Sequence, residues 1–121
     1  MRTDMKYLVL LMGDGAEAPW ASMTADDQAE LMAKFEAFDE ACEAREGVRI
    51  LTGEALGDGE SATTVRYAGG VRTDTDGPYA EAVEGLGGFY LLEAPDLDAV
   101  LDLVQVLPRY DLQISPVVDP V

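Results

Sequence analysis

The order of strand and helix patterns along the chain predicts an α+β fold, of the ferredoxin-like βαββαβ type with an extra hairpin. The first observation is the order itself, which is strand, helix, strand, hairpin, strand, helix, strand. The second is that residues 6–12 and 87–93 are apolar on both faces. These runs are the first and third main strands, which occupy the middle of such a sheet.

The N-terminal half is expected to form a strand, a helix and a second strand. Residues 6–12 (KYLVLLM) are a continuous apolar run that ends at a Gly-Asp-Gly turn. Thr24 begins the helix, with Asp27 as a capping-box-like partner, and Gly47 ends it. The apolar residues at helical spacing are Leu31, Phe35, Phe38 and Cys42. Residues 48–55 form the second strand.

The extra hairpin is expected after the second main strand. Residues 63–67 and 71–74 are joined through an Ala-Gly-Gly turn. Asp76, Gly77 and Pro78 then break the chain into a loop that runs to about residue 86, where the third main strand follows.

The C-terminal part is expected to form a second helix and a final strand over residues 112–118. Asp96 is the expected N-cap and Pro108 stops the helix. Its predicted core stripe is Leu97, Val100, Leu101 and Val104. Since two helices cover only one face of a sheet, the other face needs a cover. We therefore expect a homodimer with the two sheets face to face.

Length and composition predict a single domain over residues 1–121, because 48% hydrophobic residues suffice for a core. The formal net charge is -16, from 8 Lys and Arg against 24 Asp and Glu. This charge repels phosphates and anionic lipids, so we expect no nucleic acid and no membrane as direct partners. No signal-peptide pattern is visible at the N-terminus, and a cytoplasmic protein is expected.

Histidine is absent and there is one cysteine, which excludes Ser-His-Asp, Cys-His and His-containing zinc chemistry. Proton transfer would rest on Asp, Glu, Tyr, Lys or solvent. Cys42 is expected to be a buried free thiol. Residues 13–18 match G-x-G-x-x-A, but Asp14 and Glu17 would repel a pyrophosphate. Residues 74–77 lack the ligand pattern of a calcium loop. We expect no cofactor and no metal.

The segment 76–81 (DGPYAE) allows two interpretations. In the first, Asp76 holds a turn through its own carboxylate, while Gly77 and Pro78 fix the backbone. In the second, the carboxylate of Asp76 is held at a cleft beside the hydroxyl of Tyr79. Burial there would raise its pKa and make it an acid/base group.

Five segments together resemble the YCII-related family, specifically its DGPF branch, over nearly the full length. They are KYLVLLMGD, SATTVR, TDGPYAE, LGGFYLLEAPDLDAVL and ISPVVDP. The resemblance implies a ferredoxin-like fold paired as a dimeric α/β barrel, with a small-molecule cleft in which Asp76 matches the aspartate of the DGP motif. The sequence departs from the family because Tyr79 replaces the usual Phe, and Ala82-Val83 replace a polar Thr-Lys pair. Without His, a His-Asp dyad cannot be carried over.

Two functions remain open, and the sequence leaves undecided whether the protein is an enzyme. The resemblance implies a small dimeric protein with lyase-like or dehalogenase-like proton chemistry, in which Asp76 is the acid/base group and Tyr79 its polar partner. The other residues expected at the ligand are Asp14, Trp20, Arg66, Gly77 and Pro78. DGPF relatives are also associated with extracytoplasmic-function sigma factors, which implies a non-catalytic accessory or regulatory protein with an acidic docking surface. A structural dimer without a specific ligand is the third alternative.

Overall fold

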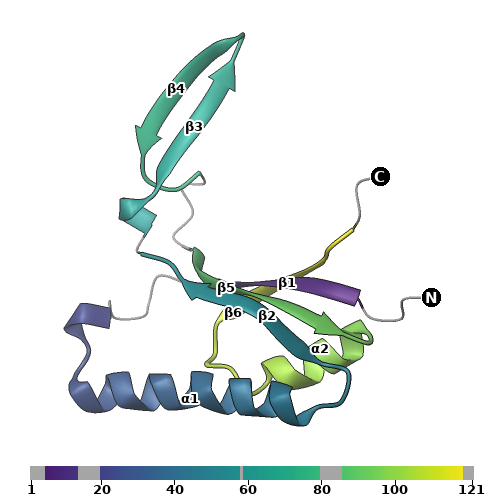
Figure 1. Ribbon diagram of the computed structural model, residues 1–121. Coiled ribbons are helices and arrows are strands. Elements are labelled where there is room, and N and C mark those ends of the chain that lie inside the picture. Colours follow the sequence, from purple (N-terminus) through teal and green to yellow (C-terminus); the bar gives the residue numbers. More distant parts are fainter. Residues whose placement is uncertain (1–4, 14–19, 58, 80–85, 119–121) are drawn as a thin grey trace.

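Four strands of the chain form one antiparallel sheet in the order β2-β5-β1-β6. The computed structural model describes residues 5–13, 20–57, 59–79 and 86–118 (Figure 1). The strand bounds are β1 Met5–Met12, β2 Arg49–Ala55, β5 Leu86–Ala94 and β6 Asp111–Pro116. The strands that are apolar on both faces, β1 and β5, are the central pair, as predicted. This α+β arrangement is compatible with the ferredoxin-like fold.

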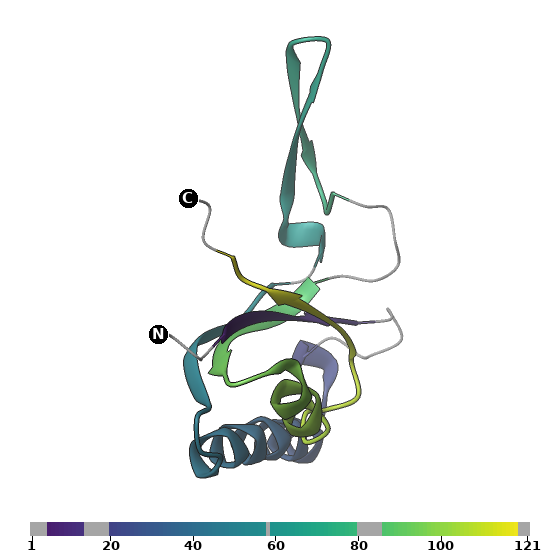
Figure 2. The same cartoon turned by 90° about the vertical axis from the view of Figure 1, so that its right-hand side faces the viewer.

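Both helices of the described part lie on the same face of the sheet (Figures 1 and 2). They are α1 (Ala25–Ala44) and α2 (Leu97–Val104). The hydroxyl of Thr24 accepts a hydrogen bond of 3.1 Å from the backbone N–H of Asp27, which confirms the predicted start of α1. The carboxylate of Asp96 likewise accepts from the backbone N–H of Ala99 at 2.9 Å. Two short 3-10 helices are also described, η1 (Trp20–Ser22) and η2 (Gly59–Ser61).

The hydrophobic core lies between the helices and this face of the sheet. Its largest fully buried side chains are Phe38, Leu92, Val9, Val100 and Cys42. The predicted core side of α1 is confirmed, because Phe38 and Cys42 are buried and Phe35 packs against the core.

The predicted core stripe of α2 is wrong in part. Leu97 and Leu101 are 44% and 46% exposed, whereas Ala99, Val100 and Leu103 are buried. The apolar residues of this helix cover a broad arc, with Asp98 and Asp102 on the remaining side, so spacing alone did not decide which part of the arc would face the sheet.

Both helices also end earlier than predicted. The backbone N–H of Arg45 bonds to the carbonyl of Cys42, and that of Leu107 bonds to the carbonyl of Val104. These tighter turns end the helices before Gly47 and Pro108 are reached.

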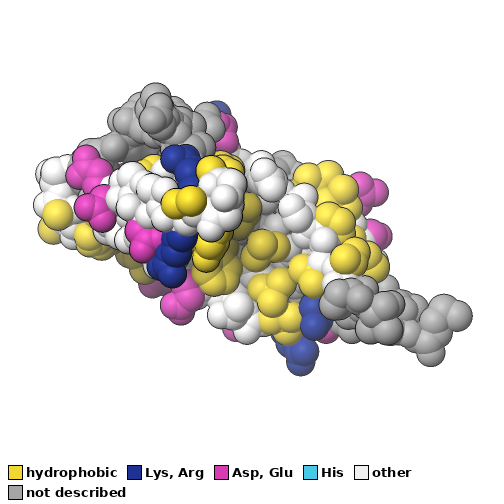
Figure 3. All heavy atoms as spheres, turned by 90° about the horizontal axis from the view of Figure 1, so that it is seen from above, with side chains coloured by type: hydrophobic (Ala, Val, Ile, Leu, Met, Phe, Trp, Pro, Cys, Tyr) yellow, Lys and Arg dark blue, Asp and Glu magenta, His cyan; other side chains and the backbone are white. Residues whose placement is uncertain are grey.

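The opposite face of the sheet has an apolar centre. Leu8 pairs with Leu91 and Leu10 pairs with Phe89, and all four side chains are partly exposed. Hydrophobic side chains gather across this side of the molecule (Figure 3). We call it the open face, because no helix among the described residues covers it.

The extra hairpin stands apart from the main sheet. It consists of β3 (Thr63–Ala68) and β4 (Val71–Asp76), and we call it the hairpin arm. Gly69 and Gly70 form its tip at φ +58° and +80°, a left-handed conformation that glycine adopts without strain. The arm rises on the same side as the open face (Figures 1 and 2). Its side chains are mostly exposed, with Tyr67 at 71%.

Candidate functional site

Two hydrogen bonds, one from the backbone and one from a side chain, join the DGP segment to the base of the hairpin arm. The N–H of Gly77 donates to the carbonyl of Ala62 at 2.7 Å. The buried hydroxyl of Thr64 donates to the carbonyl of Gly77, also at 2.7 Å. Gly77 has a φ of +108°, which strains residues with a side chain. Both hydrogen bonds join Gly77 to the start of the hairpin arm, and β4 runs two residues further than the predicted residue 74.

Arg66 and Tyr79 meet beside this segment. The guanidinium of Arg66 donates a hydrogen bond to the carbonyl of Tyr79. Its central carbon also lies 5.0 Å from the centroid of the Tyr79 ring, within the range of a cation–π interaction. Because the Tyr79 side chain is 73% exposed, the pair contributes little to stability and leaves both groups accessible.

The structure thus brings together only some of the residues that the sequence predicted for the site. Asp76, at the end of β4, is exposed and its backbone pairs with Thr63, so its carboxylate is open to solvent in the single chain. Trp20 is elsewhere, in η1 beside the start of α1, and its carbonyl accepts a hydrogen bond from the side chain of Gln28 at 2.8 Å. Asp14 lies outside the described residues.

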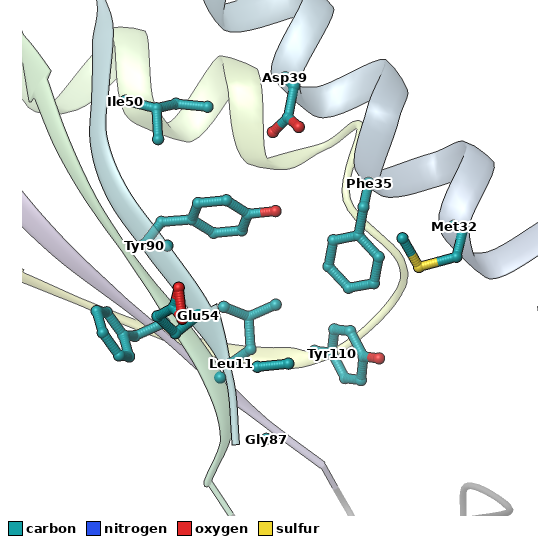
Figure 4. A pocket seen from close by; sticks show the side chains of 13 residues that line it. Leu11, Met32, Phe35, Asp39, Ile50, Glu54, Gly87, Tyr90 and Tyr110 are labelled. Atoms are coloured by element: carbon teal, nitrogen blue, oxygen red, sulfur yellow. The ribbon is translucent and has the colours of Figure 1, made fainter. Parts of the chain in front are cut away.

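A cavity that sequence reasoning missed lies between α1 and the sheet (Figure 4). Its volume is about 370 Å³, and its lining includes Phe35, Asp39, Tyr90 and Tyr110. Neither Asp76 nor Tyr79 lines it. One signal was available in the sequence, namely the glycine of β2. A Cβ atom on Gly53 would stand 2.6 Å from the Tyr90 ring, so only glycine lets this ring lie across the strand.

Two groups near this cavity have raised pKa values. Burial, followed by the negative charge of Asp39, raises the pKa of Cys42 to about 11. The same causes, in the same order, raise the pKa of the Tyr90 hydroxyl to about 12. Cys42 is thus a buried free thiol, as predicted, and it stays protonated and unreactive at neutral pH.

These shifts predict a loss of stability at alkaline pH. The pKa of each group in the folded protein lies above its ordinary value. The contribution of the group to folding stability is therefore complete below the ordinary pKa and is lost as the pH rises through the folded-state pKa. For Cys42 this window runs from pH 9.0 to about pH 11. We expect the urea midpoint of the wild type to fall more steeply across it than that of Cys42→Ala, whose position 42 does not ionise. Parallel pH profiles of the two proteins would contradict the assignment.

Comparison with known proteins identifies a family for the chain. No helix in the described part of the chain is both long and apolar enough to cross a membrane. The chain is 43% identical over 47 residues to an uncharacterized protein of Rhizobium meliloti (strain 1021). That match covers 39% of this chain and 38% of the other protein, so it spans less than half of either. The profile of the YCII-related domain matches residues 5–118. Since this match covers nearly the whole chain, the protein belongs to the YCII-related family.

Proposed function

We propose that the protein is a homodimer that binds a small molecule at the DGP segment, and that the second copy completes the site. One observation carries the proposal. The DGP segment is hydrogen-bonded at the base of an arm that rises on the same side as the apolar open face. A second chain covering the open face would lie beside this segment.

The open face supports the dimer, because a lone chain leaves the apolar centre of its main sheet in water. Leu8, Leu10 and Leu91 are partly exposed there. Exposed apolar areas of this kind are typical of surfaces that bind another protein. The sheets of two copies could pack at the usual spacing of about 10 Å.

The hairpin arm supports the same conclusion. An isolated two-stranded hairpin is marginally stable in water. Three apolar side chains of the arm are nevertheless exposed, with Val65 at 43%, Tyr67 at 71% and Val71 at 64%. A partner chain facing the open face could pack against the arm and cover these side chains. That contact would stabilise both the arm and the dimer.

The proposed chemistry is proton transfer by Asp76. Its carboxylate is exposed in the single chain, and a second copy covering the open face would enclose it beside the bound molecule, where it could exchange a proton with that molecule. Arg66 lies within reach of Tyr79 and would supply positive charge to an anionic substrate. This supports a lyase-like reaction of the kind that the DGPF resemblance implies, with Tyr79 as a polar partner.

A ligand screen with paired variants tests the site. The wild type is screened by thermal shift against small organic molecules, and each compound that raises the melting temperature is titrated into Asp76→Asn and Asp74→Asn. Asp74 lies on the same strand and pairs with Arg72 at 2.7 Å on the exposed surface, so its substitution should change little. We expect Asp76→Asn alone to weaken binding, by about tenfold or more if it contacts the ligand. Equal affinity in both variants would remove Asp76 from the site.

A second candidate is a non-catalytic partner of an extracytoplasmic-function sigma factor. The observation that favours it is the row of exposed acidic residues on α1. They are Asp26, Glu30, Glu36, Glu40 and Glu43. Such a surface could attract a basic protein face, with an affinity that falls as salt is raised. Co-purification with a sigma factor encoded by the neighbouring gene would favour this function, and a catabolic enzyme next door without such a complex would favour the enzyme.

A further inference from the structure

The cavity between α1 and the sheet has the size and lining of a ligand site separate from the DGP segment. Its volume of about 370 Å³ falls within the usual range for small-molecule pockets. Four aromatic residues line it, namely Phe35 of α1, Phe89 and Tyr90 of β5, and Tyr110 before β6. The rings of Phe35 and Tyr110 stand 6.3 Å apart at an interplanar angle of 30°. The cavity is thus walled by aromatic faces.

The polar groups of the cavity favour positive charge. Figure 4 shows the carboxylate of Asp39 and the hydroxyl of Tyr90 directed toward the space that Phe35 borders. None of the described residues that line the cavity is Lys or Arg. Asp39 and Glu54 both place a carboxylate in this lining. The net charge of -16 adds a field that draws in cations and repels anions.

The walls are held in place before any ligand enters. The Tyr90 ring lies against Gly53, where a Cβ atom would approach it to 2.6 Å, and it packs 4.9 Å from the fully buried ring of Phe38. A ring fixed in this way loses little conformational freedom on binding. Met32 at the rim is 47% exposed and has a flexible side chain that can adapt to the ligand.

From this geometry we infer that the cavity binds a hydrophobic organic cation, such as an ammonium ion carrying apolar substituents. The aromatic faces and the carboxylate of Asp39 recognise the positive charge. The apolar substituents contact the aliphatic part of the lining, which includes Leu11 and Ile50. This site does not depend on the DGP segment, and it would remain if Asp76 proved to have no ligand.

Benzyltrimethylammonium is a suitable probe, because it combines a fixed positive charge with an aromatic group. It is titrated into the full-length protein while the ring signals of Tyr90 and Tyr110 are followed by NMR. Benzyl alcohol and phenylacetate serve as neutral and anionic comparisons. We expect saturable shifts with the cation, weaker binding of the alcohol and none of phenylacetate. Equal affinity for the cation and the alcohol, or no saturable response to the cation, would overturn the inference.

Matched variants separate the site from the general charge of the protein. Asp39→Asn removes one of the two carboxylates that line the cavity, the other being that of Glu54, whereas Glu40→Gln removes the same charge from the next residue of α1, which does not line it. We expect Asp39→Asn to weaken binding of the cation by about fivefold or more, and Glu40→Gln to weaken it by less than about twofold. Equal weakening would assign the effect to net charge alone and contradict the site. Asp76→Asn should bind the cation with the affinity of the wild type, whether or not the DGP segment binds a ligand of its own.

Discussion

Replacing Phe38 with alanine should lower the free energy of unfolding by about 3–5 kcal/mol, a large share of the total for a domain of this size. Phe38 is 0% exposed and sits in the core between α1 and the sheet. Its ring packs 4.9 Å from that of Tyr90, which fixes one wall of the cavity. The substitution removes apolar contacts and leaves a void that the rigid sheet cannot fill. Urea unfolding followed by circular dichroism measures the loss.

Phe35→Ala is the matched control for this prediction. Phe35 lies one helical turn earlier on α1 and is only partly buried. Its removal should cost clearly less, because part of the ring already faces the solvent and the cavity. Equal losses for the two variants would show that the core is not centred on Phe38.

Placing a charge on the open face should abolish dimer formation. In Leu10→Asp a carboxylate replaces an apolar side chain at the centre of β1, opposite Phe89 of β5. In a face-to-face pair the two new charges would be buried without partners. The free energy needed to remove them from water exceeds the stabilisation that the contact between the sheets provides. We expect the wild type to sediment as a dimer and the variant as a monomer of 13.0 kDa, with the same circular dichroism spectrum.

Ala33→Asp controls for the added charge itself. Ala33 is exposed on α1, on the side of the sheet away from the open face. This variant should remain dimeric. A wild type that sediments as a monomer at micromolar concentration would refute the face-to-face dimer, and so would a Leu10→Asp variant that stays dimeric.

Sequence reasoning succeeded where the determining contacts are local. The helix starts at Thr24 and Asp96 depend on hydrogen bonds to residues three positions away, and the Gly69-Gly70 tip depends on backbone conformation. The central positions of β1 and β5 followed from their apolar pattern on both faces, a property that each strand displays alone.

Sequence reasoning failed where the structure depends on packing between distant segments. The buried side of α2 could not be read from a helix in which Leu97 and Leu101 are as apolar as Leu103. The cavity was missed because Phe35, Tyr90 and Tyr110 come from separate elements, and each reads as an ordinary core residue in its own segment. Within the DGP region, the contact of Arg66 with Tyr79 lies outside the hairpin register, in which Arg66 pairs with Thr73, so the hairpin pattern in the sequence did not predict it.

The placement of the two helices on one face has an electrostatic consequence for assembly. Two chains of charge -16 repel each other, and that repulsion opposes any dimer. The exposed acids of α1, however, lie on the side away from the open face. In a face-to-face pair the two acidic helices would be separated by both sheets, which pack about 10 Å apart, whereas the Debye length at physiological salt is about 8 Å. Counterions would therefore screen most of the repulsion, and a strongly acidic chain can still associate with its own copy.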